Sequence, residues 1–255
     1  AIALNSMQTN GTRIVGPAIG GFLVTKWGYA EVFAINAASY LFVLVAIYRA
    51  IIPPGTATAR TWKERLLGGF TVAFKAPQVG RPLLMMGLFT FFCLPFIGQL
   101  PAIADVNLGI DPKSTTYGWL YAMFGLGGLT GAGLIGTVFL RTPSARIAPV
   151  TLAAFSLSLG WLTLVRNVGW AFVAIYLVGL FYFALPTSLA TAWQEHVDSA
   201  IRGRVAALWV LAFGGTIPFA NIVAGPLIEL TSLTAVLLTG AAAAMALTLV
   251  RLPSG

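Results

Sequence analysis

The sequence predicts an all-α membrane protein, a bundle of helices that crosses the bilayer several times. Of its 255 residues, 58% are hydrophobic and only 9% are charged, whereas soluble domains carry about 25% charged residues. The apolar runs are continuous, whereas the strands of membrane barrels alternate apolar and polar residues over about ten positions. A chain of this composition cannot cover a globular surface with polar groups, so lipid is its expected surrounding.

Seven apolar runs are long enough to cross a hydrocarbon layer about 30 Å thick, which takes about 20 helical residues. These runs are 32–49, 83–104, 117–140, 147–165, 168–193, 205–228 and 231–250. An eighth span, residues 4–24, reaches full length only if its polar side chains face away from lipid. Those side chains are Asn5, Gln8, Asn10 and Arg13. We therefore expect about eight transmembrane helices.

The basic residues indicate the orientation of the chain in the membrane. If the spans alternate in direction, one side receives Arg49, Arg60, Lys63, Arg65, Lys75, Arg81, Arg141, Arg146, Arg202, Arg204 and Arg251. The other side receives Lys26, Lys113 and Arg166. Because Lys and Arg accumulate in cytoplasmic loops, we expect the first side, with both chain ends, to be cytoplasmic. The same bias explains the net charge of +8, so no nucleic-acid partner is expected.

The longest connection, residues 51–82, contains the stretch TWKERLLGGFTVAFKAP. Its apolar residues recur near helical spacing beside charged ones; they are Trp62, Leu66, Leu67 and Phe70. This pattern favours an amphipathic helix on the inner membrane surface, with a flexible solvated linker as the alternative. Prolines at both ends of the stretch, Pro53, Pro54 and Pro77, favour the helix.

The first span combines a cation with a kink. Arg13 precedes Gly16, Pro17, Gly20 and Gly21. Glycines four residues apart allow close helix approach, and proline removes a backbone hydrogen bond and bends the helix. An arginine at mid-bilayer costs about 2.5–3.5 kcal/mol on insertion scales, so it tends to face a bundle interior or a wet cavity. The alternative is an arginine near the helix end that reaches the headgroups.

These residues resemble a known family. The stretch RIVGPAIGGFL, residues 13–23, resembles the G-P-x-x-G-G signature in the fifth transmembrane helix of major facilitator superfamily exporters. Residues 202–230, RGRVAALWVLAFGGTIPFANIVAGPLIEL, resemble the tenth loop and eleventh helix of the branch that contains enterobactin exporters and macrolide-efflux proteins. The resemblance implies gating or packing roles for Arg13, Gly16, Pro17, Gly20 and Gly21.

The resemblance also implies a domain organisation. Residues 1–50 would be helices five and six, the last two of the N-terminal half. Residues 51–82 would be the central cytoplasmic loop, and residues 83–251 the six-helix C-terminal half. The first four helices would precede this chain and would be its natural partner. The family's loop between helices eight and nine often carries G-x-x-x-D-R-x-G-R-R; here Arg141 and Arg146 remain, but no Asp does.

A dinucleotide-binding spacing, Gly131-x-Gly133-x-x-Gly136, occurs inside an apolar run. No strand is expected before it, so helix packing is the better interpretation. The chain contains no H-E-x-x-H and no G-x-S-x-G motif. Its single cysteine, Cys93, has no disulfide partner. We expect no enzymatic activity, no cofactor and no metal.

The stretch WQEHVDS brings Glu195, His196 and Asp198 together as a conceivable metal or acid–base cluster. It stands at a helix end directly before Arg202 and Arg204. This placement favours a solvated, salt-bridged cytoplasmic loop over a catalytic site.

A secondary transporter needs a central cavity, helices that can rock or break, and usually a titratable group. Prolines interrupt most spans: Pro17, Pro95, Pro101, Pro186, Pro218 and Pro226. Polar residues inside the spans are the candidates for the cavity wall: Gln8, Asn10, Gln99, Tyr117, Tyr121, Tyr182, Thr216 and Asn221. Every carboxylate lies near a span end, so a proton-coupling carboxylate is expected in the preceding helices.

Taken with these features, the family resemblance implies a permease of the bacterial cytoplasmic membrane that exports a drug-like or siderophore-like small molecule by proton-coupled alternating access. The alternative is a non-transporting membrane scaffold, or the permease partner of a separate ATPase, because the chain itself contains no P-loop motif G-x-x-x-x-G-K-[ST].

Overall fold

The fold is seen in a computed structural model that describes residues 23, 26–50, 62–139 and 141–252. All regular secondary structure assigned within these residues is helical, which confirms the all-α prediction. The elements are α2 Tyr29–Arg49, α3 Trp62–Lys75, α4 Pro77–Cys93, α5 Pro95–Gly98, α6 Leu100–Ala102, the π-helix η1 Ile103–Asn107, α7 Thr115–Gly136, α8 Ser144–Leu164, α9 Val168–Glu195, α10 Ser199–Val210, the π-helix η2 Leu211–Gly215, α11 Thr216–Leu230 and α12 Leu233–Leu247.

Six helical stretches within the described residues are long and apolar enough to cross a membrane. They are Ala30–Arg49, Pro77–Gly98, Thr115–Gly136, Ser144–Leu164, Val168–Glu195 and Ile201–Leu230, and each matches one of the seven expected runs. The seventh run forms α12, which is shorter than expected: its 15 residues give about 22 Å of helix. The expected span over residues 4–24 lies outside the described residues, apart from residue 23.

Polar residues define where three of the helices begin. The side chains of Ser114, Asn167 and Ser232 each accept a hydrogen bond from a backbone N–H three residues later, at 3.1–3.2 Å. Such N-caps satisfy N–H groups that have no partner inside the helix. The capped helices are α7, α9 and α12, so all three start with a defined first turn.

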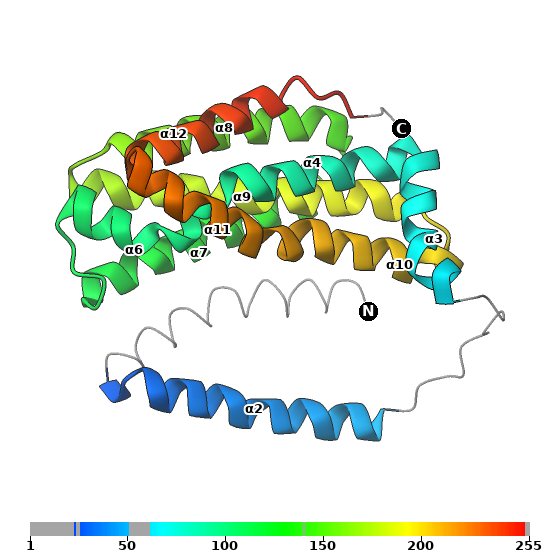
Figure 1. Cartoon of the computed structure of the whole chain (residues 1–255), viewed down its shortest axis with the longest axis horizontal. Helices are drawn as coiled ribbons and strands as arrows, with labels where there is room; N and C mark the ends of the chain where they lie inside the picture. The colour runs from blue at the N-terminus through cyan, green and yellow to red at the C-terminus, as the bar shows by residue number, and fades with distance from the viewer. Residues whose placement is uncertain (1–22, 24–25, 51–61, 140, 253–255) are drawn as a thin grey trace.

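The helices between residues 77 and 247 pack in three layers (Figure 1). Helices α8 and α12 pack against each other in the layer farthest from α2 in the view. Helices α9 and α4 form the middle layer, where α9 packs against α8 and α4 packs against α12. On the side nearest α2, α7 packs against α9, and α11 packs against α4.

One end of this bundle collects the arginines, and we call it the basic end. Arg81 lies near the start of α4, Arg141 and Arg146 lie at the connection between α7 and α8, and Arg202 and Arg204 lie near the start of α10. The other end of the bundle, where α8 ends and α9 begins, is called the opposite end.

Glycines bring α7 and α9 into backbone contact. A Cβ atom added at Gly127 would overlap the Tyr176 carbonyl oxygen, and one added at Gly131 would overlap the Leu180 carbonyl oxygen. A step of four residues forward along α7, from Gly127 to Gly131, moves the contact four residues forward along α9, from Tyr176 to Leu180. The two helices therefore run in the same direction. Gly179 on α9 likewise faces the Phe124 carbonyl. The packing interpretation of the motif is therefore confirmed at Gly131, as in other membrane helix pairs with small residues at the interface. It is not borne out at Gly133 and Gly136, where an added Cβ atom would meet nothing within 4 Å.

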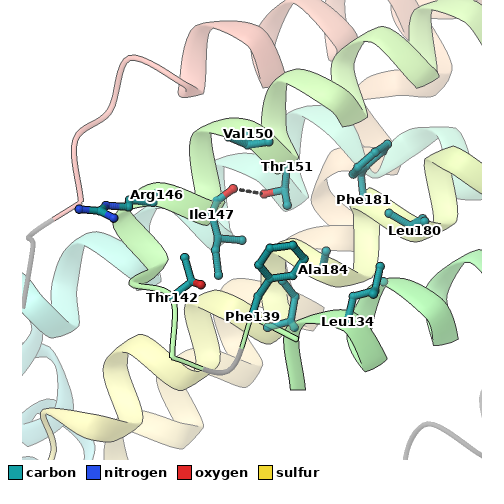
Figure 2. Close-up of a pocket in the computed structure, with 12 residues that line it drawn as sticks. Leu134, Phe139, Thr142, Arg146, Ile147, Val150, Thr151, Leu180, Phe181 and Ala184 are labelled. Atoms are coloured by element: carbon teal, nitrogen blue, oxygen red, sulfur yellow. Dashed lines mark hydrogen bonds between the residues drawn. The ribbon is translucent and has the colours of Figure 1, made fainter. Parts of the chain in front are cut away.

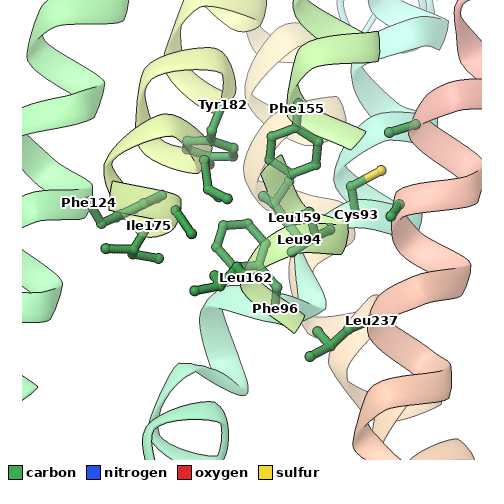
Figure 3. Close-up of a cluster of buried hydrophobic side chains, with 14 of the residues drawn as sticks. Cys93, Leu94, Phe96, Phe124, Phe155, Leu159, Leu162, Ile175, Tyr182 and Leu237 are labelled. Atoms are coloured by element: carbon green, nitrogen blue, oxygen red, sulfur yellow. The ribbon is translucent and has the colours of Figure 1, made fainter. Parts of the chain in front are cut away.

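Aromatic rings fill the middle of the bundle (Figure 3). Phe89, Phe96 and Phe155, from α4, α5 and α8, are almost completely buried. The Phe89 and Phe155 rings meet edge-to-face with centroids 5.0 Å apart, and the Phe124 and Tyr182 rings lie 5.6 Å apart. Edge-to-face pairs of this kind add about 0.5–1.5 kcal/mol to the burial of the rings. This cluster ties the three layers together.

The connection before α4 contains the predicted helix, α3, rather than a flexible linker. Helix α3 packs against α4 and α10 at the basic end. At Gly69, a Cβ atom would lie 3.0 Å from the Arg204 carbonyl oxygen, so α3 approaches the α10 backbone closely. Whether α3 lies on a membrane surface stays a prediction.

Helix α2 contributes little to this core. None of the residues of α2 whose side chains are described is buried. Phe42 is 80% exposed and Tyr48 is 92% exposed. In Figure 1, α2 runs alongside the bundle on the side of α7 and α11. An apolar helix with this much exposed surface is expected to face lipid or other helices.

Candidate functional site

A cavity lies toward the basic end, on the surface formed by α3, α4, α10, η2 and α11. It has a volume of about 530 Å³, within the roughly 300–1,000 Å³ of typical small-molecule sites. We call it the α4–α11 cavity. Its lining residues are Phe70, Ala73, Phe74, Pro77, Gly80, Arg81, Leu83, Leu84, Leu208, Leu211, Ala212 and Thr216.

A local break in the helix shapes one wall of this cavity. Pro218 has no N–H to donate to the carbonyl of Gly214, four residues earlier. The turn directly before it, Leu211–Gly215, is a π-helix. This wider form is rare in proteins overall but is often found at functional sites. The Thr216 hydroxyl donates to the Ala212 carbonyl at 3.0 Å, which satisfies one backbone acceptor of the widened turn.

The other wall comes from the start of α4 and from α3. Gly80 packs directly on α3, because a Cβ atom there would overlap the Ala73 carbonyl oxygen. Leu84 is 60% exposed and Phe74 is 86% exposed. The Arg81 guanidinium donates to the Arg251 carbonyl at 3.1 Å and is the one charged group of the lining. An apolar cavity with a cation and a hydroxyl at its edge suits an amphipathic ligand.

Two further predicted lining residues lie where α5 meets α11. The Asn221 side chain donates to the Ile217 carbonyl at 3.0 Å. It sits so close to Gly98 that a Cβ atom there would lie 2.6 Å from its Oδ1. Gln99, the next residue, is half-buried. The structure therefore places Asn221 against Gly98, the residue directly before Gln99, in the broken segment that starts at Pro95.

The three predicted tyrosines form part of a chain of rings. Ring centroids are 6.5 Å apart for Tyr117 and Tyr121 and 6.1 Å apart for Tyr121 and Phe124. Tyr117 and Tyr121 are half-buried on α7, whereas Tyr182 is only 3% exposed, inside the aromatic core of Figure 3. Of the six candidate lining residues that the structure describes, Thr216 is the one that lines the α4–α11 cavity. Gln8, Asn10 and the glycine–proline motif with Arg13 lie outside the described residues.

The predicted loop charges lie at the basic end, as their positions in the chain require. Arg141, Arg146, Asp198 and Arg202 are exposed, and Arg204 is half-buried. Arg202 donates to the Val197 carbonyl at 3.4 Å. The predicted salt bridges are not seen among the described residues of this loop, whose charged side chains are exposed apart from the half-buried Arg204.

The Glu195, His196 and Asp198 cluster is a solvated helix end in this structure. All three residues are exposed, and His196 Nδ1 bonds the Ala192 carbonyl at 2.8 Å. Within the described residues, no group of three His, Cys, Asp or Glu side chains is placed to hold a metal ion.

Comparison with known proteins identifies the family. Residues 1–254 match the family described as transmembrane secretion effector, a family of the major facilitator superfamily. The chain belongs to this family. The match agrees with the layered helical bundle and with the expected class of membrane transporter.

The curated relatives of this chain are named as transporters. The enterobactin exporter EntS of Shigella boydii is 26% identical over 211 residues, which cover 81% of this chain and 49% of the relative. EntS of an Escherichia coli strain is 28% identical over 200 residues, or 77% of this chain and 46% of the relative. An MFS-type transporter of Bacillus subtilis, YfiS, is 28% identical over 140 residues, or 53% of this chain and 34% of the relative.

The chain thus spans about half the length of these exporters. No solved structure matches it. Family membership makes this chain a multi-pass membrane protein of a transporter family, whose helices the structure shows to be apolar and long enough to span a bilayer.

Several lining residues of the α4–α11 cavity escaped the sequence analysis. Arg81 counted only as a loop charge, and Leu84, Leu211 and Ala212 are ordinary apolar residues. The signal that pointed nearest to them is Gly214–Gly215 followed by Pro218, which marks a place where a helix cannot continue regularly.

Proposed function

We propose that this chain is part of a secondary transporter that exports an amphipathic small molecule by proton-coupled alternating access. The observation that carries the proposal is the α4–α11 cavity, whose apolar wall includes one cation, Arg81, and one hydroxyl, that of Thr216. The transporter family and the exporter relatives support the same function.

The cavity wall indicates the class of substrate. Leucine and phenylalanine side chains offer an apolar surface, while Arg81 offers a charge and Thr216 a hydroxyl. A ligand with an aromatic or aliphatic body and a polar or anionic group would satisfy both. Drug-like molecules and siderophores have this character, and two relatives are named as exporters of enterobactin.

We further propose that four transmembrane helices precede this chain and complete the passage. Apolar residues on the side of the bundle that would face them are widely exposed, with Leu84 at 60%, Phe219 at 65% and Ile222 at 69%. The described carboxylates stand near span ends, as Asp105 and Glu229 do, and both are exposed. The carboxylate that carries the coupling proton therefore belongs to the preceding helices.

The proposed setting is the bacterial cytoplasmic membrane, with the basic end and both ends of the chain in the cytoplasm. The α4–α11 cavity would then load from the cytoplasm or the inner leaflet. Arg13 and the Gly16–Pro17 kink, with Gly20 and Gly21, would pack the fifth helix against its neighbours and close the opposite side.

Transport by the intact protein in everted membrane vesicles tests this function. Respiration should drive uptake of a fluorescent amphipathic dye, and a protonophore should abolish it. Thr216→Trp fills the α4–α11 cavity and should lower the initial rate at least tenfold. Leu157→Trp changes an exposed leucine of α8, in the layer farthest from α2, and should leave the rate unchanged.

Two results would contradict the proposal. Equal rates in the Thr216→Trp and Leu157→Trp variants would remove the cavity from the transport path. Uptake that follows ATP and ignores the protonophore would support a permease partner of an ATPase, and no uptake of any dye or siderophore would support a scaffold.

A further inference from the structure

A second cavity lies on the flank of the bundle, away from the α4–α11 cavity. It runs between α7, α8 and α9 near the basic end and has a volume of about 250 Å³ (Figure 2). We call it the α7–α9 groove. Its lining residues are Gly131, Leu134, Ile135, Phe139, Thr142, Arg146, Ile147, Val150, Thr151, Leu180, Phe181 and Ala184.

The interior of this groove is apolar, and the Thr151 hydroxyl inside it already has hydrogen-bond partners. Its floor is the buried cluster of Ile135, Ile147 and Ala184. The hydroxyl of Thr151 donates to the carbonyls of Ile147 and Ala148, both at 3.0 Å, within its own helix. No polar group of the floor therefore needs a hydrogen-bonding ligand, so the groove suits a hydrocarbon chain.

The mouth of the groove is cationic. Arg146 belongs to the lining, and its side chain extends away from the groove interior in Figure 2. Among the described residues, no acceptor is found for its guanidinium, although its backbone N–H bonds the Pro143 carbonyl at 2.9 Å. Arg141 is exposed nearby in the chain, and the lining contains no carboxylate. Such a mouth complements an anion rather than a neutral group.

The groove is open to the surroundings of the bundle. Val150, on its α8 wall, is 66% exposed, and Leu134, on its α7 wall, is 39% exposed. Its volume lies below the range of sites that enclose a drug-sized molecule. A hydrocarbon chain laid along the surface fits these dimensions better than an enclosed substrate does.

We propose that the α7–α9 groove is a binding site for an anionic phospholipid. One acyl chain lies between α7 and α8 over Ala184, and the phosphate group pairs with the Arg146 guanidinium. Basic pockets between transmembrane helices are a recurrent way to hold anionic headgroups. With the basic end in the cytoplasm, the ligand comes from the inner leaflet.

Native mass spectrometry of the purified chain in detergent tests this site. The probes are phosphatidylglycerol and phosphatidylethanolamine with identical acyl chains, and inorganic phosphate alone. The wild type should retain one phosphatidylglycerol in preference to phosphatidylethanolamine. Arg146→Gln should weaken phosphatidylglycerol binding about fivefold, the effect of one basic side chain near an anionic surface, and leave phosphatidylethanolamine binding unchanged.

Matched variants separate the groove from general lipid adhesion. Val150→Trp blocks the groove and should weaken binding of both lipids. Leu157→Trp, two turns farther along α8, and Arg49→Gln, which removes a basic residue from the exposed end of α2, should behave like the wild type. Circular dichroism spectra of all variants should match the wild type.

The proposal is wrong if Arg146→Gln retains phosphatidylglycerol as well as Arg49→Gln does. It is also wrong if Val150→Trp behaves like Leu157→Trp. Binding of inorganic phosphate with the same dependence on Arg146 as phosphatidylglycerol would mean an anion site without an acyl chain, and it would overturn the lipid assignment as well.

Discussion

The contact between α7 and α9 gives the sharpest prediction for stability. Gly131→Ala adds one methyl group whose three nearest neighbours are backbone atoms of Leu180. Backbone atoms cannot rotate away as a flexible side chain can, so the two helices must separate. Overpacking in a close-packed core costs typically about 1–3 kcal/mol, and here the upper part of that range applies.

Gly133→Ala is the matched control, because a Cβ atom at Gly133 meets nothing within 4 Å. Replacing glycine by alanine inside a helix gains about 1 kcal/mol in both variants. Gly133→Ala should therefore be as stable as the wild type or more stable. Gly131→Ala should be less stable than Gly133→Ala by about 2–3 kcal/mol, since only the overpacking distinguishes them.

The assay is reversible unfolding of the purified chain in mixed detergent micelles with increasing dodecyl sulfate, followed by tryptophan fluorescence. Equal midpoints for the two variants would show that α7 and α9 do not touch along Gly131. That result would also contradict the parallel course of these two helices, which rests on the same backbone contacts.

Two further predictions use the same assay. Ser156→Ala removes the hydrogen bond of 2.7 Å from its hydroxyl to the Ala241 carbonyl, which links α8 to α12, and should cost about 1 kcal/mol. The control Ser158→Ala removes a bond within α8. If both serine variants lose the same free energy of unfolding, the α8–α12 link contributes nothing. Phe155→Ala empties the centre of the aromatic core and should lower the free energy of unfolding by about 3–5 kcal/mol. A loss under about 1 kcal/mol would mean that this core is not packed as described.

The helices could be predicted from the sequence because lipid imposes a simple length rule on apolar runs. Six of the seven plain runs became helices long enough to span, and Pro77 correctly marked the boundary between α3 and α4. Pro53 and Pro54 lie outside the described residues. The exception was α12. After Leu247 the backbone bonds tighten to a spacing of three residues, from Thr248 N–H to the Met245 carbonyl and from Leu249 N–H to the Ala246 carbonyl, both at 3.1 Å. Hydropathy alone does not register such a local change.

The cavity was harder to predict because it depends on how distant segments dock. Thr216 stood out as a polar residue inside an apolar run and proved to line the α4–α11 cavity. Arg81 and Leu84 did not stand out, because only the packing of α3 and η2 around α4 places them in one wall. Tyr182 has the same polar signature as Thr216, yet its ring packs in the core.

Water access to the α4–α11 cavity tests the account most directly. Cys93 is buried, so single cysteines introduced elsewhere report on a silent background. Thr216→Cys and Leu157→Cys both lie near the middle of their membrane-spanning helices. In membrane vesicles, a charged, membrane-impermeant maleimide should label Thr216→Cys in the wet cavity and spare Leu157→Cys, which faces lipid. If Leu157→Cys were labelled and Thr216→Cys were protected, Thr216 would not lie in a wet cavity and Leu157 would not face lipid. That result would contradict the proposed passage.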